Sequence, residues 1–382
     1  MSFLRRSWAE IDINAIIDNF NSIKGRCSSS AIMCVVKADA YGHGANYLSK
    51  VYDNLGADYY AVAALSEALN LRRFGTKTPI LILGYTLPEY YEYVVNNNIT
   101  QTIFSYEDAL LLSKCAVSLN KTAKVHIKID TGMTRLGFDL NDNTISQIIK
   151  ISKLNGIEIE GVFSHFAVSD EADPDNYTKL QFDKFVGFTD QLKSNGVNIL
   201  YRHISNSGGV FASSKYQLDM VRPGIALYGL YDSVNYDNSL KPALSLKTII
   251  AQIRKVPQNT TVSYGRTYCC SENKTLATIP IGYADGYNRQ LSNKGRVIIN
   301  GKFAPIVGRV CMDQTIIDVT GIDCKQGDTV ILIGSDGTNN ISASELARLS
   351  NTINYEIVCA ISDRIPRLYI KDGAIEHILD KL

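Results

Sequence analysis

The segment AIMCVVKADAYGHG (residues 31–44) begins with six apolar residues and changes abruptly at Lys37. The apolar run is typical of a buried β-strand, and the Gly-His-Gly sequence predicts a turn after it. A buried ammonium group is costly unless it is paired or neutralised, and lysine is also a side chain with which enzymes form Schiff bases. Lys37 is therefore either a strand-end lysine that reaches solvent or a candidate nucleophile.

Similar units follow along the first 230 residues. Seven further apolar runs predict strands at residues 59–64, 79–84, 99–104, 123–130, 157–163, 198–204 and 220–229. Amphipathic stretches between them predict helices, among them residues 66–75, 106–114 and 178–196. Eight strands, each followed by a helix or a turn, predict a parallel sheet closed into a (β/α)8 TIM-type barrel. Chemistry in such barrels lies at the C-terminal ends of the strands, where Lys37 is expected.

The sequence changes character after about residue 240. Alternating apolar residues and Gly- and Asn-rich turns over 244–334 predict an antiparallel β domain, followed by a helix at 341–351. Residues 7–25 predict a strand and a helix that pack with this second domain. We therefore expect an α/β + β fold, with the barrel over residues 9–238 and a mainly β domain formed by residues 1–8 and 239–382.

Composition limits the function classes. The 382 residues are 45% hydrophobic and 20% charged, with a net charge of +1, which is ordinary for a soluble globular protein and gives no argument for nucleic acid. The eight cysteines form no CxxC pair and the five histidines show no zinc spacing, so we expect no metal. No apolar run is long enough to span a bilayer. The N-terminus lacks a signal peptide, which favours the cytoplasm, although MSFLRR is also compatible with a junction to an upstream membrane domain.

Nine motifs, in order, resemble those of the alanine racemase family. They are VVKADAYGHG (35–44), HIKIDTGMTRLGF (126–138), FSHFA (163–167), HISNSGG (203–209), MVRPGIALYG (220–229), VSYGRTY (262–268), IPIGYADGY (279–287), VGRVCMDQ (307–314) and TINYEIVCAIS (352–362). The resemblance runs from residue 8 to about 370. It implies a pyridoxal-phosphate (PLP) enzyme with the two domains predicted above. Such an enzyme interconverts L- and D-alanine by a two-base mechanism and supplies D-alanine for cell-wall peptidoglycan.

The resemblance also assigns the cofactor contacts. It implies that Lys37 holds PLP covalently and that Arg222 faces the pyridine nitrogen. Because arginine keeps its proton, this nitrogen would stay unprotonated, which favours racemisation over transamination. The other positions that match cofactor-binding residues of the family are Tyr41, His165, Asn206, Ser207, Gly224, Ile225 and Tyr355.

On the substrate side, the resemblance makes Tyr264 the second acid/base group, opposite Lys37. Tyrosine is a poor base unless its pKa is depressed, and His165 is the residue expected to tune it. Lys128 matches a lysine that family members often carry as a carbamate, which would hold Arg135; a lysine paired with a carboxylate is the alternative. Positions matching substrate-binding residues are Arg135, Tyr283, Met312 and Asp313, and those matching the entry corridor are Asp170, Arg289 and Arg309.

Lys37 and Tyr264 lie more than two hundred residues apart, in different domains. The resemblance implies a head-to-tail homodimer in which each barrel mouth is capped by the partner's β domain. We expect His43, His126 and His203 to be structural.

Four alternatives stay open at this point. The first, inside the family, is a serine or broad-spectrum racemase, such as the serine racemase module of vancomycin resistance. The second is a non-catalytic PLP-binding barrel, against which residues 240–370 argue. The third is a PLP decarboxylase, whose acidic partner for the pyridine nitrogen does not agree with Arg222. The fourth is a cofactor-free lysine aldolase, which leaves Ser207, Gly224 and Tyr355 unexplained.

Overall fold

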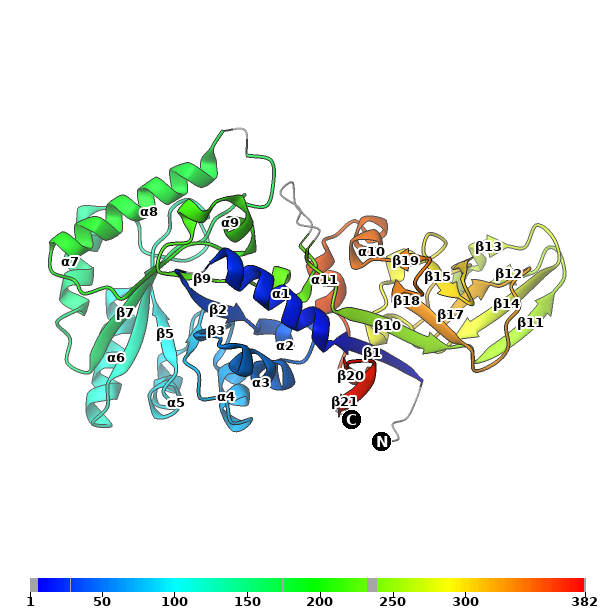
Figure 1. The fold of residues 1–382 in the computed structure, drawn as a ribbon, viewed down its shortest axis with the longest axis horizontal. Helices are drawn as coiled ribbons and strands as arrows, with labels where there is room; N and C mark the ends of the chain where they lie inside the picture. The colour runs from blue at the N-terminus through cyan, green and yellow to red at the C-terminus, as the bar shows by residue number, and fades with distance from the viewer. Residues whose placement is uncertain (1–5, 28, 174, 232–238, 381–382) are drawn as a thin grey trace.

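The computed structural model describes residues 6–27, 29–173, 175–231 and 239–380. Figure 1 shows two bodies along the long axis of the molecule: strands surrounded by helices at one end, and a second body built largely of strands at the other. The first and last strands, β1 (Ser7–Asp12) and β21 (Ala374–Leu379), lie close to each other near the junction of the bodies (Figure 1). No helix in the described ranges is both long and apolar enough to cross a bilayer.

The first body is the predicted barrel. In the described part of the chain, its sheet has eight parallel strands in the order β8-β7-β6-β5-β4-β3-β2-β9. The strands are β2 (Ala31–Val35), β3 (Tyr59–Val62), β4 (Ile80–Ile82), β5 (Thr100–Ile103), β6 (Ala123–Lys128), β7 (Ile157–Phe163), β8 (Tyr201–His203) and β9 (Met220–Val221). Between β8 and β9, the Arg222 N–H donates to the Ser205 carbonyl over 2.9 Å. The predicted barrel is confirmed.

Helices connect these strands and lie outside them, with α7 and α8 along one side in Figure 1. The three helices named from periodicity correspond to α4, α6 and α8. The helical segments of the barrel are α2 (Lys37–Tyr41), α3 (Ala45–Leu55), α4 (Leu65–Arg73), η1 (Pro88–Tyr90), α5 (Tyr91–Asn96), α6 (Tyr106–Ser118), α7 (Asp142–Ile151), α8 (Tyr177–Ser194), α9 (Ser207–Ala212), η2 (Ser214–Tyr216) and η3 (Ile225–Tyr228).

The prediction of a strand over residues 220–229 is wrong for most of its length. β9 ends at Val221, and Ile225–Tyr228 form the 3₁₀ helix η3. Pro223 has no N–H for a ladder, and Gly224 adopts φ −120° and ψ −94°, outside the strand region. The run is apolar because these residues are buried in the core, where burial alone does not distinguish a strand from a helical turn.

The second body is mainly antiparallel, as predicted. Its largest sheet has the strand order β16-β15-β18-β10-β1-β20-β21, and β19 pairs with β18 outside this order. In this sheet, β1 and β20 are parallel. Two smaller sheets have the orders β11-β14-β17 and β12-β13. Its elements are β10 (Leu244–Ile249), β11 (Gln252–Val256), β12 (Thr261–Val262), η4 (Tyr264–Arg266), β13 (Tyr268–Cys269), β14 (Lys274–Ile279), η5 (Tyr283–Asp285), η6 (Arg289–Leu291), β15 (Arg296–Ile299), β16 (Lys302–Pro305), β17 (Thr315–Asp318), β18 (Thr329–Ser335), β19 (Asn340–Ile341), α10 (Ala343–Ser350), α11 (Asn354–Cys359), β20 (Arg367–Lys371) and β21 (Ala374–Leu379).

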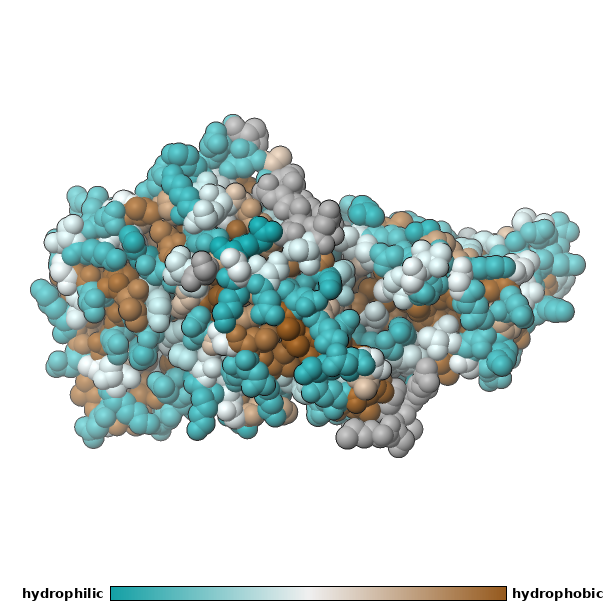
Figure 2. All heavy atoms as spheres, viewed as in Figure 1, coloured by the Kyte–Doolittle hydropathy of each residue, from teal (hydrophilic) through white to brown (hydrophobic). Residues whose placement is uncertain are grey.

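The N-terminal strand and helix join the two bodies. β1 (Ser7–Asp12) pairs with β10 and β20, so residues 9–12, which we expected in the barrel, are hydrogen-bonded in the β-domain sheet. α1 (Ile13–Arg26) contacts α3 and η3 of the barrel as well as β20. In Figure 2, apolar atoms gather where α1 meets α2 and α3, within a largely polar face. The expected second boundary, at residue 238, falls on residues outside the described ranges.

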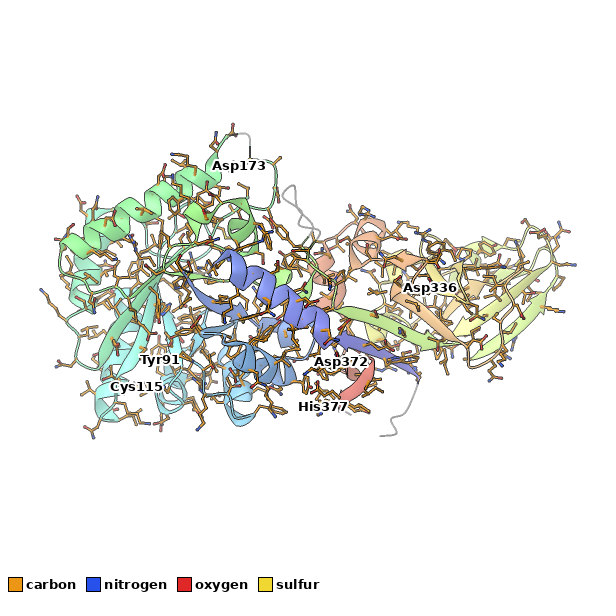
Figure 3. All side chains as sticks on the ribbon, viewed as in Figure 1. Tyr91, Cys115, Asp173, Asp336, Asp372 and His377 are labelled. Atoms are coloured by element: carbon orange, nitrogen blue, oxygen red, sulfur yellow. The ribbon has the colours of Figure 1, made fainter. Side chains whose placement is uncertain are left out.

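The C-terminal hairpin packs against the barrel. The Tyr47 ring of α3 lies 4.1 Å from the Tyr369 ring and 4.9 Å from the His377 ring, and both pairs are stacked. Figure 3 labels His377 at this hairpin, beside β20 and β21. Residues from the end of the chain therefore support the first βα unit.

Candidate active site

Lys37 begins an unusual turn at the C-terminal end of β2. The four residues Ala38–Tyr41 all have φ between 50° and 54°, so they form a left-handed turn without glycine. This conformation costs roughly 1–2 kcal/mol for each such residue. Two carboxylates stabilise it: Glu67 accepts the Ala38 N–H over 2.6 Å, and Asp39 accepts the Ala45 N–H over 2.8 Å.

The C-terminal segment holds the turn from the other side. Arg367 is almost fully buried and donates to the Gly42 carbonyl over 3.2 Å. Its other nitrogens donate to the carbonyls of Ile361, Ser362 and Ile365. A Cβ atom on Gly42 would lie 2.2 Å from the Val358 carbonyl oxygen, so β-domain backbone packs directly on this glycine. The position of Lys37 thus depends on both domains.

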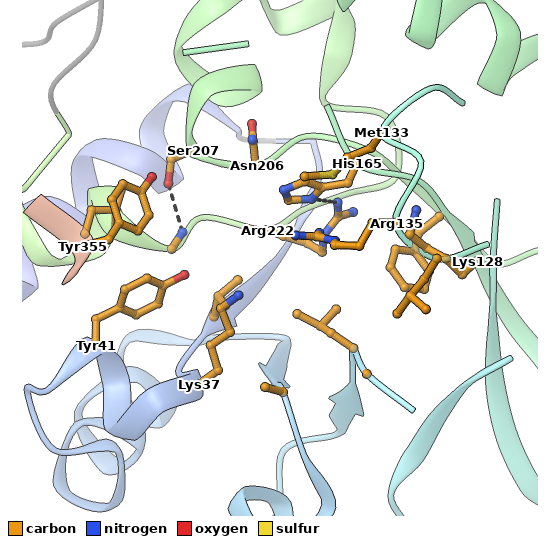
Figure 4. A pocket seen from close by; sticks show the side chains of 18 of the residues that line it. Lys37, Tyr41, Lys128, Met133, Arg135, His165, Asn206, Ser207, Arg222 and Tyr355 are labelled. Atoms are coloured by element: carbon orange, nitrogen blue, oxygen red, sulfur yellow. Dashed lines mark hydrogen bonds between the residues drawn. The ribbon is translucent and has the colours of Figure 1, made fainter. Parts of the chain in front are cut away.

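Lys37 lines a cavity of about 540 Å³ at the C-terminal ends of the barrel strands. The cavity brings together every residue expected to bind the cofactor: Lys37, Tyr41, His165, Asn206, Ser207, Arg222, Gly224, Ile225 and Tyr355. Lys128 and Arg135 also line it. Figure 4 shows these side chains converging from several strands on one space.

Four basic side chains line the cavity: Lys37, Lys128, Arg135 and Arg222. Burial, reinforced by the nearby Arg135, lowers the pKa of Lys37, which favours the free amine. Burial and the charge of Arg222 lower the pKa of Lys128 to about 7. Burial, with Arg135, lowers the pKa of Arg222 to about 9, so this guanidinium stays charged at neutral pH. An anionic ligand would be attracted to the charged Arg222 guanidinium.

Lys128 lies deep in the barrel, and its Nζ donates to the Ile129 carbonyl over 2.9 Å. Its Nζ also lies 5.3 Å from the centre of the Phe163 ring. Among the described residues, it forms no ion pair with a carboxylate. The charge of Asp130 acts on Lys128 and opposes the lowering of its pKa, but this carboxylate forms no ion pair with the lysine, so the described residues show no paired carboxylate.

One side of the cavity forms a cradle of hydroxyl and backbone N–H groups. The Ser207 hydroxyl accepts the N–H of Gly224 over 3.0 Å and that of Ala226 over 3.3 Å. A Cβ atom on Gly224 would lie 2.7 Å from the Tyr41 hydroxyl, so only glycine leaves this space open. The Tyr41 and Tyr355 rings lie 5.9 Å apart, and Figure 4 shows their hydroxyls directed toward the same region as Ser207. Such convergent donors suit a phosphate group.

Arg222 forms the opposite wall. Its Nη2 donates to the Ser164 carbonyl over 2.6 Å and to His165 Nδ1 over 3.2 Å. Its Nη1 donates to His203 Nδ1 over 2.7 Å. None of the hydrogen bonds within the described ranges uses its Nε, so this N–H remains to donate to a ligand in the cavity.

The β-domain residues expected in the site lie elsewhere in the single chain. Tyr264 is 70% exposed, Met312 is 53% exposed and Tyr283 is 43% exposed, and none of the three lines the cavity around Lys37. Tyr283 and Met312 are neighbours, because the Ala284 N–H donates to the Met312 carbonyl over 3.0 Å. The structure therefore brings together the barrel residues but leaves the β-domain residues at a separate surface.

A buried carboxylate organises that surface. Asp285, 1% exposed, accepts the Gly282 N–H over 3.0 Å and pairs with Arg6 over 2.9 Å. Arg364 lies 3.6 Å from Asp285 and pairs with Asp313 over 2.8 Å. The loops that carry Tyr283 and Met312 are thereby fixed relative to each other.

The three corridor residues are divided between the domains. Arg309 lies beside the Tyr264 turn, with its Nη1 3.0 Å from where a Cβ atom on Gly265 would stand. Arg289 begins η6 in the β domain. Asp170 belongs to the barrel and lies near Tyr355, whose pKa is raised by burial and by this carboxylate.

Comparison with known proteins identifies the family to which the chain belongs. The family profile described as "Alanine racemase, N-terminal domain" matches residues 11–232, and that described as "Alanine racemase, C-terminal domain" matches residues 243–369. The chain belongs to the alanine racemase family. An alanine racemase of Clostridium tetani is 46% identical over 380 residues, which cover 98% of each chain.

Solved structures agree with this assignment. The alanine racemase of Clostridium difficile 630 superposes with a TM-score of 0.95 at 40% identity, over 100% of both chains. That of Bartonella henselae, solved with covalently bound pyridoxal phosphate, has a TM-score of 0.86 at 32% identity over 96% of this chain and 100% of that chain. The fold and the family expected from the sequence are confirmed, and the family is PLP-dependent.

The cavity fits this cofactor. Ser207, Gly224 and the two tyrosines form a cradle for a phosphate, and the glycine leaves the space that a Cβ atom would fill. The unused Nε of Arg222 suits a ring nitrogen that accepts a hydrogen bond. Lys37 offers an amine with a lowered pKa for an aldehyde.

Sequence reasoning missed three residues that shape the site. Glu67 supports the lysine turn, and its position near the start of the helix SEALNLRR was the available signal. Phe163 stacks on His203, with ring centres 4.9 Å apart. It belongs to the motif FSHFA, in which only His165 was expected to act in the site. Asp285 had no local signal, because its partners Arg6 and Arg364 are distant in sequence.

Proposed function

We propose that the protein interconverts L- and D-alanine, with PLP held covalently on Lys37 Nζ. The observation that carries the proposal is the cavity itself. It combines a strand-end amine of lowered pKa, a phosphate-sized cradle and an arginine donor in a chain 46% identical to an alanine racemase. We further propose that the reaction takes place in the cytoplasm and supplies D-alanine for peptidoglycan.

The barrel residues would bind the cofactor at its two ends. Arg222 Nε would donate to the ring nitrogen, and His165 and Asn206 would line the ring. The phosphate would be held by Tyr41, Ser207, Gly224, Ile225 and Tyr355. Bound PLP supplies an electron sink that acidifies the Cα–H bond of the amino acid. Because Arg222 only donates, it does not give up a proton to the ring nitrogen, which limits transamination.

Racemisation requires one proton to leave one face of Cα and another to arrive at the opposite face. Lys37 Nζ would hold or release the proton on one face. Tyr264 Oη would do so on the other, and a tyrosine is a useful base only with a lowered pKa. Arg135 and Arg222, which line the cavity, are the positively charged groups that a tyrosine entering it would face.

We propose that a second copy supplies this tyrosine. The support is that Tyr264 is 70% exposed in the single chain and does not line the cavity that contains the other reactive groups. A symmetric homodimer would form two identical sites, each with Lys37 of one chain and Tyr264 of the other. Tyr283, Met312 and Asp313 would enter with it, and Asp170, Arg289 and Arg309 would border the approach.

The substrate carboxylate would be bound by the Arg135 guanidinium and the Met312 backbone N–H. Charged, planar donors such as arginine favour carboxylates. We propose that Lys128 carries a carbamate that holds Arg135 in place. Two observations support this role: burial and Arg222 lower the pKa of Lys128 to about 7, which makes the neutral amine accessible near neutral pH, and no carboxylate within the described residues forms an ion pair with it.

Reduction with borohydride tests the cofactor assignment. The wild-type protein should be yellow, and peptide mapping after reduction should locate the adduct on Lys37. Lys37→Ala should lose the adduct, whereas the matched variant Lys128→Ala should keep it. An adduct on Lys128 or another lysine in the wild type would overturn the assignment.

Kinetics with L-alanine and L-serine on one preparation test the substrate. A small pocket rejects an added hydroxyl by about a hundredfold at most, so we expect kcat/KM for alanine to exceed that for serine by about tenfold or more. Equal or higher kcat/KM for serine would reassign the protein to the serine branch of the family.

A further inference from the structure

Four buried side chains form a continuous hydrogen-bonded row beneath the cofactor cavity. Arg222 Nη1 lies 2.7 Å from His203 Nδ1, His203 Nε2 lies 2.8 Å from His126 Nδ1, and His126 Nε2 lies 3.4 Å from Glu160 Oε2. We call Arg222, His203, His126 and Glu160 the interior row. It connects β9 to β7 through the inside of the barrel.

The hydrogens of the interior row can be arranged in one direction. Arginine has donors and no acceptor, so His203 Nδ1 must accept, and the proton of a neutral His203 must lie on Nε2. His203 Nε2 then donates to His126 Nδ1, which places the His126 proton on its own Nε2. That N–H ends at a carboxylate oxygen of Glu160, which only accepts. The two ends of the row, Arg222 and Glu160, therefore dictate the tautomers of both imidazoles.

Both histidines are neutral in this environment. Burial lowers the pKa of His126, and burial together with the Arg222 charge holds the pKa of His203 well below its usual range. Glu160 is ionised: burial tends to raise its pKa, but hydrogen bonds from His126, Lys124 and Tyr59 outweigh burial and lower it to about 2. The row thus has a cation at one end, an anion at the other and two oriented neutral rings between them.

The backbone is shaped around this row. The β6–β7 register shifts between Val125 and His126, whose partners are Ile159 and Gly161, so Glu160 is the extra residue of a β-bulge. Bulges redirect a side chain and are frequent beside active sites. A Cβ atom on Gly161 would lie 2.8 Å from His126 Nδ1, so this glycine leaves the room that the ring occupies.

Glu160 is itself held firmly. Its Oε1 accepts from Lys124 over 2.5 Å, and its Oε2 accepts from the Tyr59 hydroxyl over 2.6 Å. Tyr59 also lies 2.5 Å from the Thr100 hydroxyl. At the other end, the Phe163 ring is parallel to the His203 ring within 2° and lies 5.3 Å from the Arg222 guanidinium carbon. These contacts leave little freedom for either ring to rotate.

We propose that Glu160 is a positioning residue for the racemase reaction: it fixes the tautomers of His126 and His203 so that a lone pair faces Arg222 and holds its guanidinium toward the cofactor. No proton moves along the row. The inference rests on the proposed function in one respect, namely that Arg222 faces PLP. His126 and His203, which we expected to be only structural, then act on the cofactor through Arg222.

Nitrogen NMR of the histidine side chains tests the tautomers without any turnover. In uniformly ¹⁵N-labelled protein, His126 and His203 should each show a protonated Nε2 and an unprotonated Nδ1, with assignment by single His→Gln variants. A protonated Nδ1 on His203, or a cationic imidazole at neutral pH, would overturn the proposal. This result stands whether or not the protein racemises alanine, so failure of the proposed function is recognised separately.

Paired variants test the effect on the reaction. Glu160→Leu removes the acceptor, whereas Glu160→Gln keeps an oxygen for His126. We expect the ratio of transamination to racemisation to rise about tenfold in Glu160→Leu and to return within about twofold of wild type in Glu160→Gln. Glu345→Leu removes a carboxylate that pairs with Arg296 in the β domain, and should leave the ratio unchanged. An unchanged ratio in folded Glu160→Leu, or the same rise in Glu345→Leu, would reduce Glu160 to a structural role.

Gly161→Ala provides a second approach if Glu160→Leu does not fold. The new methyl group would displace the His126 ring without altering any charge. We expect the His203 Nδ1 signal to shift and the ratio to rise, whereas Gly187→Ala, at a site with nothing within 4 Å, should change neither. No change in Gly161→Ala would contradict the proposal.

Discussion

The barrel mouth and the β-domain loops differ in whether a single chain assembles the expected site residues around a cavity. Around Lys37, the reactive groups are buried, mutually positioned and contained in one chain. In the β domain, Asp285 orders the loops that carry Tyr283 and Met312, but these two residues and Tyr264 are exposed and do not line the cavity around Lys37. The cavity of the barrel is therefore formed within one chain, whereas the proposed role of the β-domain surface requires a second copy.

Subunit mixing gives the largest expected effect and tests this difference directly. Lys37→Ala and Tyr264→Phe homodimers should each be nearly inactive as racemases. After random exchange, half of the dimers are mixed and half of their sites are intact, so about a quarter of wild-type activity should return. If both residues acted within one chain, no intact site could form. A mixture that stays inactive, with exchange confirmed by mass, would refute the shared site.

Replacement of Arg222 tests the electronics of the barrel side alone. Arg222→Glu places a carboxylate opposite the ring nitrogen and would stabilise its protonated form. We expect transamination to rise relative to racemisation by about tenfold or more. Product analysis for pyruvate and D-alanine measures both reactions, and Arg135→Lys serves as a control that alters substrate binding. An unchanged ratio would show that the donor character of Arg222 is irrelevant.

The next prediction concerns the support that the β domain gives to the barrel. Arg367→Met would leave four carbonyls, including that of Gly42, without their charged donor. We expect a loss of about 3–5 kcal/mol in the free energy of unfolding, measured with urea, and weaker retention of PLP. Arg296→Met, which removes a partly exposed ion pair, should cost far less. Equal losses would mean that Arg367 does not hold the lysine turn.

The interior of the barrel should also respond to pH in a defined direction. The pKa of Glu160 falls from 4.5 to about 2 on folding. The ionised carboxylate therefore stabilises the folded protein fully above pH 4.5, and this stabilisation is lost as the pH falls toward 2. Above pH 4.5, we expect the free energy of unfolding of the wild type to exceed that of Glu160→Gln by at most about 3 kcal/mol. Urea titrations at several pH values measure the difference, which should shrink on acidification. A difference that grows at low pH would contradict an ionised Glu160.

The smallest effect concerns strain at Lys37. Ala38 is exposed and has φ 50°, so Ala38→Gly removes a strained conformation and few contacts. We expect the protein to gain about 1 kcal/mol in stability, partly offset by the freer unfolded chain. Thermal unfolding measures this gain. A loss of stability would show that the turn is held by the Ala38 side chain.

The sequence predicts the barrel well because buried parallel strands read as apolar runs, and seven of the eight expected strands coincide with observed ones. The strand predicted over 220–229 is mostly wrong, because the apolar residues around Pro223 and Gly224 indicate burial but do not indicate the backbone conformation. The motifs also place Lys37 and Arg222 in one cavity. The left-handed turn after Lys37 is invisible in the sequence, since Ala38–Tyr41 contains no glycine to signal positive φ.

Other features depend on tertiary contacts that no local pattern encodes. His126 and His203 are separated by seventy-seven positions, and only the adjacency of β6, β7 and β8 brings them to Arg222. We expected both histidines to be structural, and the role proposed for the interior row would add a part in the reaction that their sequence context does not show. Asp285 likewise depends on Arg6 and Arg364, which are contributed by opposite ends of the chain.

The pairing of β1 with β20 has a consequence for the order in which the protein is made. β1 is synthesised before its two neighbours, and one of its edges waits for β10 (residues 244–249) while the other waits for β20 (residues 367–371). The barrel, whose strands are consecutive apart from β9, can form during that interval. A nascent chain stopped before residue 367 would carry the barrel strands and a β1 that is paired with β10 on one edge only, and the open edge invites association with other chains.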